Sequence, residues 1–333
     1  MAGTDSSTAP LPPRGGFAGF EDRIFERMDH RPTRYATVGV LLLITILIPV
    51  FCSNYVLEIF TNSFLYVVLC LGLNIVAGYA GLLDLGYAAF FAIGAYTSGV
   101  LTSQYGWNFW LAIPPALALA AAVGVMIGAP TLRLRSDYLA IVTLGAGEII
   151  RILARNLKHI TGGPSGLIGI KRPTFFGLEL NQINHYYYIF LVMALVALVV
   201  SYRLEHSRLG RAWKYVRDDE DVAEAMGIPK SLIKLSAYIM GAMFAGLAGC
   251  FFAAKMTAIS PDSFTFLQSL MIVVAMVLGG MGKIAGMVVG ALVMVLFPEV
   301  FRTIGPLRML VFGVILILMM VFRPQGIWPQ RRH

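Results

Sequence analysis

Charged side chains are scarce in this sequence of 333 residues. Aspartate, glutamate, lysine and arginine make up 13% of the chain, hydrophobic residues make up 58%, and the mean hydropathy is +0.75. A soluble protein carries about 25% charged residues, so this composition indicates a protein that faces lipid. The net charge of +8 does not indicate nucleic-acid binding, because the basic residues lie at the ends of apolar segments, where membrane proteins place them.

Motifs for nucleotide, metal and covalent chemistry are missing as well. There is no phosphate-binding loop of the form G-x-x-x-x-G-K-S/T, and the nearest string, residues 278–284, has Ile284 where the hydroxyl side chain should stand. No two histidines have the spacing of metal ligands, and no Ser/His/Asp set is visible. The three cysteines, Cys52, Cys70 and Cys250, are interpreted as small packing residues. We therefore expect a chain that is not an enzyme, binds no metal or cofactor itself, and has no nucleic-acid partner.

Long apolar runs without charge predict about ten membrane-spanning helices, since roughly 20 such residues cross a bilayer. Lipid offers no hydrogen bonds to a peptide backbone, so continuous, non-alternating runs favour helices and do not support strands. The expected fold class is an all-α polytopic membrane protein. The predicted helices are 36–53, 60–79, 86–103, 109–130, 138–156, 186–203, 233–254, 265–280, 285–301 and 308–322.

The distribution of lysine and arginine predicts the orientation of these helices. The polar segment 1–34 carries five arginines and no cleavable apolar core, so it is interpreted as a cytoplasmic tail and not as a signal peptide. With the N-terminus inside, most basic residues fall on the cytoplasmic side. This assigns residues 35–325 to a transmembrane domain, with a cytoplasmic loop at 204–232 and an outer loop at 157–185. Residues 326–333 are predicted to form a cytoplasmic C-terminal tail.

One segment concentrates charge, since thirteen charged residues lie between Arg203 and Lys234. Four consecutive acids, residues 218–221, suit the first turn of a helix, where the helix dipole favours negative charge. Gly227 is a typical C-terminal stop. The pattern predicts a short capped helix over about 217–228, held in water between two spans. We interpret it as a surface on which a cytosolic partner docks; the alternative is the solvated tip of a helical hairpin.

Further features place polar groups beside or within the apolar segments. Asp84 follows a glycine-rich stretch and is either a cap for the next helix or a polar group at the gate of a solute route. Glu148 and Arg151 share one helical face and form either an internal ion pair or part of that route. Asn74 is another candidate for lining it.

The segment 161–167 is rich in glycine and contains a proline, which predicts a shaped turn. It is either an ordinary loop or a seat for a partner on the outer side of the membrane. The residues singled out in it are Gly162, Gly163, Pro164 and Gly166.

A family becomes recognisable from several strings that occur in order. They are GYAGLLDLGYAAFFAIGAY at 78–96, DYLAIVTLGAGEIIR at 137–151, TGGPSGL at 161–167, GRAW at 210–213, RDDED at 217–221, AMG at 225–227, AGLAG at 245–249 and VLGGMG at 277–282. Together they resemble the permeases of branched-chain amino-acid ABC importers, the LivH/LivM family, and among them the LivM type of subunit. The resemblance covers about residues 60–325 and leaves the tail 1–34 outside.

The resemblance implies a division of labour in a bacterial inner membrane. Two permease subunits, this chain and a LivH-like one, would form the pathway for leucine, isoleucine and valine. Two cytosolic subunits would bind and hydrolyse ATP, and a periplasmic binding protein would deliver the amino acid. The chain departs from the common coupling motif, Glu-Ala-Ala followed by glycine, because Met226 follows Glu224 and Ala225. The residues that the resemblance assigns to ATPase coupling are Arg217, Asp218, Asp219, Glu220, Asp221, Ala223, Glu224, Ala225, Met226 and Gly227.

Two other transport functions remain open at this point. Permeases for urea and short-chain amides are related, but they tend to have Ser-Leu-Gly-His where this chain has Asp84-Leu-Gly86-Tyr87, which favours amino acids. An ion-coupled secondary transporter would need an intramembrane carboxylate, and Glu148 is the candidate. A membrane-embedded enzyme is disfavoured, since no catalytic cluster is visible.

Overall fold

The structure is a computed structural model of the chain. It describes residues 52–131, 136–175, 182–302 and 307–322, together with 43, 45–49, 178–179, 305 and 326–327. The predicted tail 1–34, most of the predicted span 36–53 and most of the predicted tail 326–333 lie outside the described residues. Met1–Ser53 and Asn54–His333 are separate compact units. In the first unit residues 45–49 are helical, and everything below concerns the second.

Helices in the second unit coincide with the predicted spans that follow 36–53. α3 (Asn54–Leu73) continues directly into a π-helix, η1 (Asn74–Tyr79). The other helices of this set are α4 (Ala88–Ser103), α5 (Phe109–Thr131), α6 (Ser136–Asn156), α8 (Ile183–Glu205), α11 (Lys230–Met256), α12 (Phe266–Gly279), α13 (Ile284–Val300) and α14 (Leu307–Phe322). The fold is therefore a mainly α-helical bundle, as the continuous apolar runs predict.

Five segments of the described chain are long and apolar enough to cross a membrane. They are Asn54–Tyr79, Phe109–Thr131, Ile183–Glu205, Lys230–Met256 and Pro261–Gly279, while Ala88–Ser103 and Ile284–Val300 are apolar but shorter. The chain is thus a multi-pass membrane protein, and the count of ten crossings stays a prediction.

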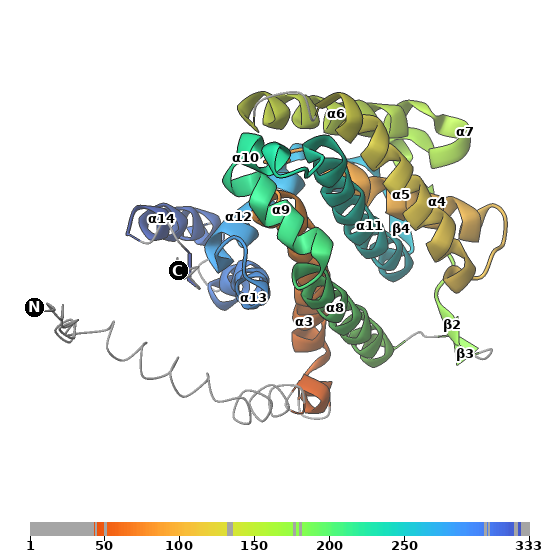
Figure 1. Cartoon of the computed structure of the whole chain (residues 1–333). Coiled ribbons are helices and arrows are strands. Elements are labelled where there is room, and N and C mark those ends of the chain that lie inside the picture. The colour runs from red at the N-terminus through yellow and green to blue at the C-terminus, as the bar shows by residue number, and fades with distance from the viewer. Residues whose placement is uncertain are drawn as a thin grey trace, which may run out of the picture. The chain divides into compact units, whose positions relative to one another are not determined.

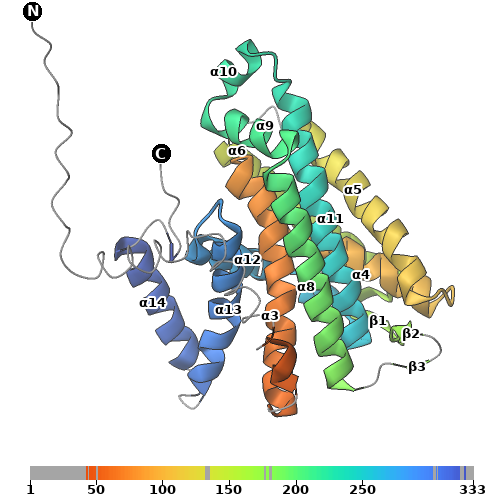
Figure 2. The same cartoon turned by 60° about the horizontal axis from the view of Figure 1, so that its bottom comes forward.

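Small residues allow the helices of the bundle to approach one another closely. α3, α8 and α11 run side by side (Figure 2). Between α4 and α11, a Cβ atom on Gly94 would lie 2.1 Å from the carbonyl oxygen of Gly246, and one on Gly249 would lie 2.2 Å from that of Phe91. Because a side chain at these glycines would collide with backbone, they fix the contact between the two helices, as small residues do in membrane bundles.

Short elements connect the helices at both ends of α8 and α11. At one end α9 (Arg208–Asp218) and α10 (Glu220–Ala225) join α8 to α11 (Figure 2). The predicted outer loop 157–185 contains α7 (Lys158–Thr161), the 3₁₀ turn η2 (Gly163–Ser165), and strands β1 (Leu167–Ile168), β2 (Thr174–Phe175) and β3 (Leu178–Glu179). β4 (Ala258–Ile259) and the 3₁₀ turn η3 (Pro261–Ser263) follow α11.

The strands form two short antiparallel pairs. β1 pairs with β4, with Leu167 opposite Ile259. β2 pairs with β3, with Thr174 opposite Glu179 (Figure 1). The expectation that the chain has no strands is therefore wrong for these loops. Each strand has two residues, too few to produce an alternating pattern in the sequence.

Candidate functional site

α9 is an amphipathic helix that packs on the start of α11. It begins at Ser207, whose Oγ accepts a hydrogen bond from the backbone N–H of Gly210 at 3.1 Å, a standard N-cap arrangement. Its apolar face buries Trp213 completely. The indole Nε1 donates to the Oγ of Ser236 at 2.9 Å and to the carbonyl oxygen of Ile233 at 3.1 Å, both in α11. These two part-buried bonds, together with the fully buried indole ring, join α9 to α11.

The chain breaks between α9 and α10 at Asp219, so the prediction of a single helix over 217–228 is wrong. Asp219 has an extended backbone (φ −157°, ψ 113°), and its side chain accepts from the backbone N–H groups of Asp221 and Val222, each at 3.0 Å. Arg217 and Asp218 are therefore the last residues of α9, not the first of α10. Aspartate forms an N-cap readily, and here that preference outweighs helix continuation.

The end of α10 is closed by the glycine that the sequence indicates. Gly227 has φ +82°, a left-handed conformation that favours glycine. Its N–H donates to the carbonyl oxygen of Glu224 at 2.9 Å, and the N–H of Ile228 donates to that of Ala223 at 3.0 Å. This pair of bonds is a Schellman motif. α10 is thus a six-residue helix that is capped at both ends.

Ion pairs hold α10 against the first turns of α11. Lys230 Nζ lies 2.7 Å from Glu224 Oε2 and 3.6 Å from Asp221 Oδ1, and Lys234 Nζ bonds to Glu220 Oε1. Lys234 is buried whereas the acids are largely exposed. The acids of the predicted coupling segment therefore do two things, since they brace α10 and also leave negative charge at its surface.

α10 also exposes two large apolar side chains. Val222 is 58% exposed and Met226 is 78% exposed, and because they are four positions apart they lie on one side of this turn. Ala223 is buried beneath them. This surface consists of an apolar pair bordered by acids, on a short helix that ion pairs hold against α11. Such a surface is suited to docking in a groove.

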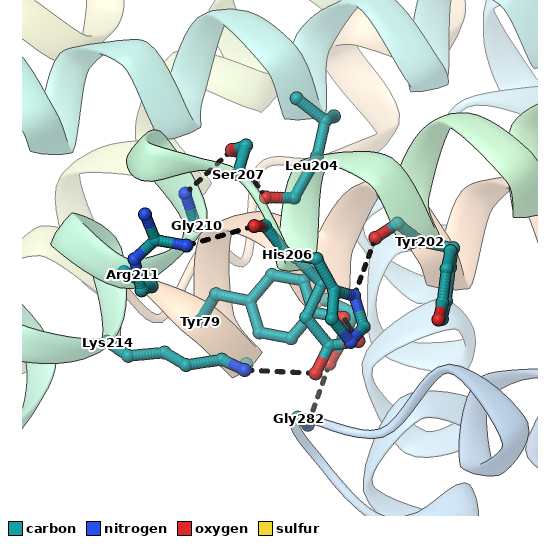
Figure 3. Close-up of polar contacts among 12 residues, drawn as sticks. Tyr79, Tyr202, Leu204, His206, Ser207, Gly210, Arg211, Lys214 and Gly282 are labelled. Atoms are coloured by element: carbon teal, nitrogen blue, oxygen red, sulfur yellow. Dashed lines mark hydrogen bonds and ion pairs between the residues drawn. The ribbon is translucent and has the colours of Figure 1, made fainter.

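A second set of contacts joins α9 to the end of α3. Arg217 Nη1 donates to the carbonyl oxygen of Gly78 in η1 at 2.6 Å. Lys214 Nζ lies 2.9 Å from Glu205 Oε1 and 5.3 Å from the centre of the Tyr79 ring, and the Tyr79 hydroxyl donates to Glu205 Oε2 at 3.2 Å. Figure 3 shows Lys214 reaching past Tyr79 toward this carboxylate. Sequence reasoning missed Lys214, Glu205 and Tyr79, because their partners come from three different helices.

η1 is also joined to the loop that precedes α13. Asn74 is fully buried, and its Oδ1 accepts from the backbone N–H of Gly282 at 2.8 Å. A Cβ atom on Gly78 would lie 2.0 Å from Asn74 Oδ1 and 2.9 Å from Gly282 N, so a glycine is needed there for the bond to form. π-helical turns are rare and occur mostly at functional sites. This one is the point where α3, α9 and the 280–283 loop meet.

The four residues predicted to line the solute route are not brought together. Asn74 lies in η1, whereas Glu148 and Arg151 lie in α6 and form an ion pair at 2.7 Å, with Arg151 Nη1 also 3.5 Å from Asp262 Oδ1. Asp84 is fully buried in the turn between η1 and α4. Its Oδ1 accepts from the N–H of Gly86 at 2.8 Å, and its Oδ2 has no hydrogen-bond partner among the described residues.

A pocket connects the turn after Asp84 to Glu148. It lies where α4 begins, between α6 and α12, and it is lined by residues including Leu85, Gly86, Leu144, Gly147, Glu148 and Ser269. The N–H of Leu85 donates to Thr143 Oγ1 at 3.2 Å, which fixes this turn to α6. Glu148 therefore lines one pocket with the residues that directly follow Asp84, while Asn74 belongs to the contacts of η1 described above.

The glycine-rich segment 161–167 forms a fixed turn. Gly162, Gly163 and Gly166 all have positive φ, between +66° and +77°, and Pro164 lies in the 3₁₀ turn η2. A Cβ atom on Gly166 would lie 2.0 Å from the carbonyl oxygen of Ile259 in β4. The turn therefore packs the end of α6 against β4, and only glycine fits at its tightest point.

Metal chemistry finds no support in the described residues, since no group of three or more histidine, cysteine or acidic side chains there is placed to hold an ion.

Comparisons with known proteins identify the family to which the chain is similar. The family model described as "Branched-chain amino acid transport system / permease component" matches residues 55–320. The LivM permease protein of the high-affinity branched-chain amino acid transport system of Escherichia coli K12 is 41% identical over 315 residues, covering 88% of this chain and 74% of that protein. The LivH permease protein of the same bacterium is 24% identical over 246 residues, covering 69% and 79%. A probable LivM of Methanocaldococcus jannaschii is 23% identical over 321 residues, covering 80% and 91%. No solved structure matches the chain.

Proposed function

This chain belongs to the family of permease components of branched-chain amino acid transport systems, and we propose that separate subunits power it by hydrolysing ATP. As a permease it is a transport protein and not an enzyme. The amino acids concerned are leucine, isoleucine and valine, which cross the bacterial inner membrane by alternating access. The loop 204–232 and both termini lie on the cytoplasmic side in this proposal, which the excess of basic residues in those segments supports.

The partners follow from the relatives. Because LivM and LivH are both named as permease proteins of one high-affinity system, this LivM-like chain pairs with a LivH-like permease. Two cytosolic ATP-binding subunits and a periplasmic amino-acid-binding protein complete the assembly. The fixed turn that contains Gly162, Gly163, Pro164 and Gly166 is a seat for the binding protein, since its rigid backbone needs no ordering on contact.

The surface of α10 is the proposed contact with the ATP-binding subunits. The observation that carries this assignment is the exposed apolar pair, Val222 and Met226, on a helix that is capped at both ends and joined by ion pairs to α11. Such a helix moves as one body with its neighbours, so displacement of a partner groove displaces α11 as well. The exposed acids of this surface, Asp218 and Asp221 among them, favour a partner groove with a basic rim.

The pocket between the turn that follows Asp84 and Glu148 is a proposed part of the solute route. Asp84 comes directly before the residues that line this pocket. Its carboxylate is fully buried, and its Oδ2 has no hydrogen-bond partner among the described residues, an arrangement that is unfavourable unless it serves a polar solute or water. The ion pair of Glu148 with Arg151 borders the same pocket. Asn74 does not line this pocket; its Oδ1 accepts from Gly282, and its Nδ2 is buried without a hydrogen-bond partner among the described residues.

The proposal is tested by introducing charge into the apolar pair. The double variant V222E/M226E should insert normally but lose its ATP-binding subunits on purification and lose ATP-driven leucine uptake in proteoliposomes that contain all subunits. The control is Tyr105→Glu, an equally exposed site in the loop between α4 and α5, which should behave as the parent. Normal co-purification of V222E/M226E would reject the contact, and uptake that continues with ATPase-dead partners would reject ATP as the energy source.

A further inference from the structure

A row of polar residues runs along the outer half of α3. Glu58, Asn62 and Tyr66 are spaced by four, so they lie on one face of the helix. Their neighbours Leu57, Leu65 and Val67 are buried, whereas the row itself is partly or largely exposed on this chain. In a helix that crosses a membrane, an accessible polar face does not suit contact with lipid.

Side chains from two other helices meet this row. Lys255, in the last turn of α11, places its Nζ 2.6 Å from Asn62 Oδ1 and 4.0 Å from Glu58 Oε1. Gln268, in α12, donates from its Nε2 to the hydroxyl of Tyr66 at 3.2 Å. The side chain of Lys255 is 10% exposed, and the side chain of Glu58 is 52% exposed. Opposite charges and amide groups thus line one seam between α3, α11 and α12.

The row reaches the middle of the membrane-crossing segment. Asn54–Tyr79 has 26 residues, and Tyr66 stands at its midpoint. At about 1.5 Å of rise per residue, Glu58 and Tyr66 are roughly 12 Å apart along the helix. Polar groups this deep in a membrane protein usually face a water-filled cavity or a solute path.

The residues that continue this spacing toward η1 are buried. Continuing by fours, Cys70 is fully buried and its Sγ contacts the carbonyl oxygen of Ile272 at 3.9 Å. Asn74 is fully buried and bonded to Gly282. The seam between α3 and α12 is therefore polar and accessible on the outer side, and sealed on the inner side.

We propose that Glu58, Asn62, Tyr66, Lys255 and Gln268 form the outer half of the solute route and contact the amino acid directly. A zwitterion carries the two charges that this seam complements. Its carboxylate binds the ammonium group of Lys255 together with the amide of Asn62, and its own ammonium group binds the carboxylate of Glu58. Glu58 and Lys255 are 4.0 Å apart, so a solute enters between them without breaking a tight ion pair. This inference rests on the proposed function, which does not say which groups bind the amino acid at the outer side, and it names those groups.

The first experiment measures access to water in the complete importer in liposomes. Asn62→Cys and Tyr66→Cys are made in a Cys52→Ser background, since Cys70 and Cys250 are buried, and are exposed to a membrane-impermeant thiol reagent on the outer side. Both should react at least about tenfold faster than Val192→Cys, a control on an exposed apolar site of α8. Tenfold corresponds to about 1.4 kcal/mol of difference in access. Reaction of Asn62→Cys and Tyr66→Cys no faster than that of the control overturns the proposal.

The second experiment separates solute contact from a structural role. Lys255→Met should lower the leucine carried per ATP hydrolysed by about tenfold, the effect of losing one charge-assisted hydrogen bond, while ATPase stimulation by the loaded binding protein remains. Lys255→Arg should restore most of it. Tyr55→Phe is the control. It removes a hydroxyl group at the same end of α3, but this hydroxyl donates to Glu299, so the leucine carried per ATP should stay unchanged.

The outcomes distinguish the two levels of the argument. Parental leucine per ATP in Lys255→Met overturns the solute contact and leaves the proposed function standing. Should Lys255→Met fail to retain its ATP-binding subunits, the thiol labelling decides the question by itself. Failure of the parental importer to carry leucine with ATP would instead count against the proposed function.

Discussion

Arg217 attaches α9 to η1, the π-helical continuation of α3, and its replacement tests whether motion of α10 reaches the bundle through that attachment. Its Nη1 donates to the Gly78 carbonyl oxygen at 2.6 Å. The aliphatic part of the side chain packs on Gly81, where a Cβ atom would lie 2.7 Å from Arg217 Cγ. Arg217→Met keeps the packing and removes the guanidinium group.

The expected cost can be worked from this geometry. A hydrogen bond to a charged group contributes about 1.5–3 kcal/mol, and the Arg217 side chain is 27% exposed, which favours the lower figure. About 1.4 kcal/mol changes an equilibrium tenfold, so α9 should separate from η1 roughly ten times more often. α10 itself is unchanged, and the ATP-binding subunits should therefore still bind.

The assay is leucine uptake and ATP hydrolysis measured together in proteoliposomes with all subunits. Arg217→Met should retain ATPase activity and carry several-fold less leucine per ATP. Arg211→Met is the matched control, because Arg211 lies on the same helix but donates to the nearby carbonyl oxygen of His206 at 3.1 Å in the turn between α8 and α9. Equal leucine per ATP in Arg217→Met and the parent, or an equal loss in both variants, would refute the role assigned to the attachment.

Three further variants test the other contacts. Asp219→Ala should destabilise α10 by about 1 kcal/mol through loss of its N-cap and reduce co-purification of the ATP-binding subunits, whereas Asp219→Ser should retain both. Asn74→Leu leaves the buried N–H of Gly282 without an acceptor, at a cost of about 1–3 kcal/mol, and should lower the melting temperature of the purified complex. The control variant Asn74→Asp should melt closer to the parent. Identical melting temperatures of Asn74→Leu and the parent would count against that contact. Gly166→Ala places a Cβ atom 2.0 Å from a backbone carbonyl oxygen of β4 and should reduce stimulation of the ATPase by the binding protein, while Gly169→Ala, also at positive φ but with open space around it, should reduce it much less.

The helices of this fold are predictable because the membrane sets their length and composition. Runs such as 109–130 and 186–203 leave the backbone no partner except itself, and the corresponding helices begin and end within three residues of the predicted limits. The C-terminal end of α10 is also predictable from the sequence, because Gly227 ends the helix as predicted. The break at Asp219 carried a local signal too, an aspartate ahead of two more acids, which fits an N-cap as well as a helix interior.

The contacts that organise the site were not predictable, because they join residues far apart in the sequence. Asn74 and Gly282 are separated by 208 positions, and Lys255 and Asn62 by 193. Neither asparagine stands in a recognisable motif, and a lysine at the end of an apolar helix is equally consistent with an interfacial anchor. The roles of these residues follow from their partners on neighbouring helices, and only the packed bundle shows which residues those partners are.

The two halves of α3 connect the proposed motor contact to the proposed solute route. α3 carries Glu58 and Asn62 near the end where it begins, and η1, which continues α3 at its other end, carries Asn74 and Gly78. Gly78 is held by Arg217 of α9, and the adjoining bond of Asn74 to Gly282 closes the seam toward α13. A displacement of α9 therefore acts first on the π-helical turn, where the bonds that seal the inner half are located. The proposed outer half is joined by other bonds, from Lys255 to Asn62 and from Gln268 to Tyr66, and Tyr66 is roughly 18 Å along the helix from Gly78. In this proposal a displacement of α9 opens the inner end of the route while Lys255 still holds the solute, which is the order of events that alternating access requires.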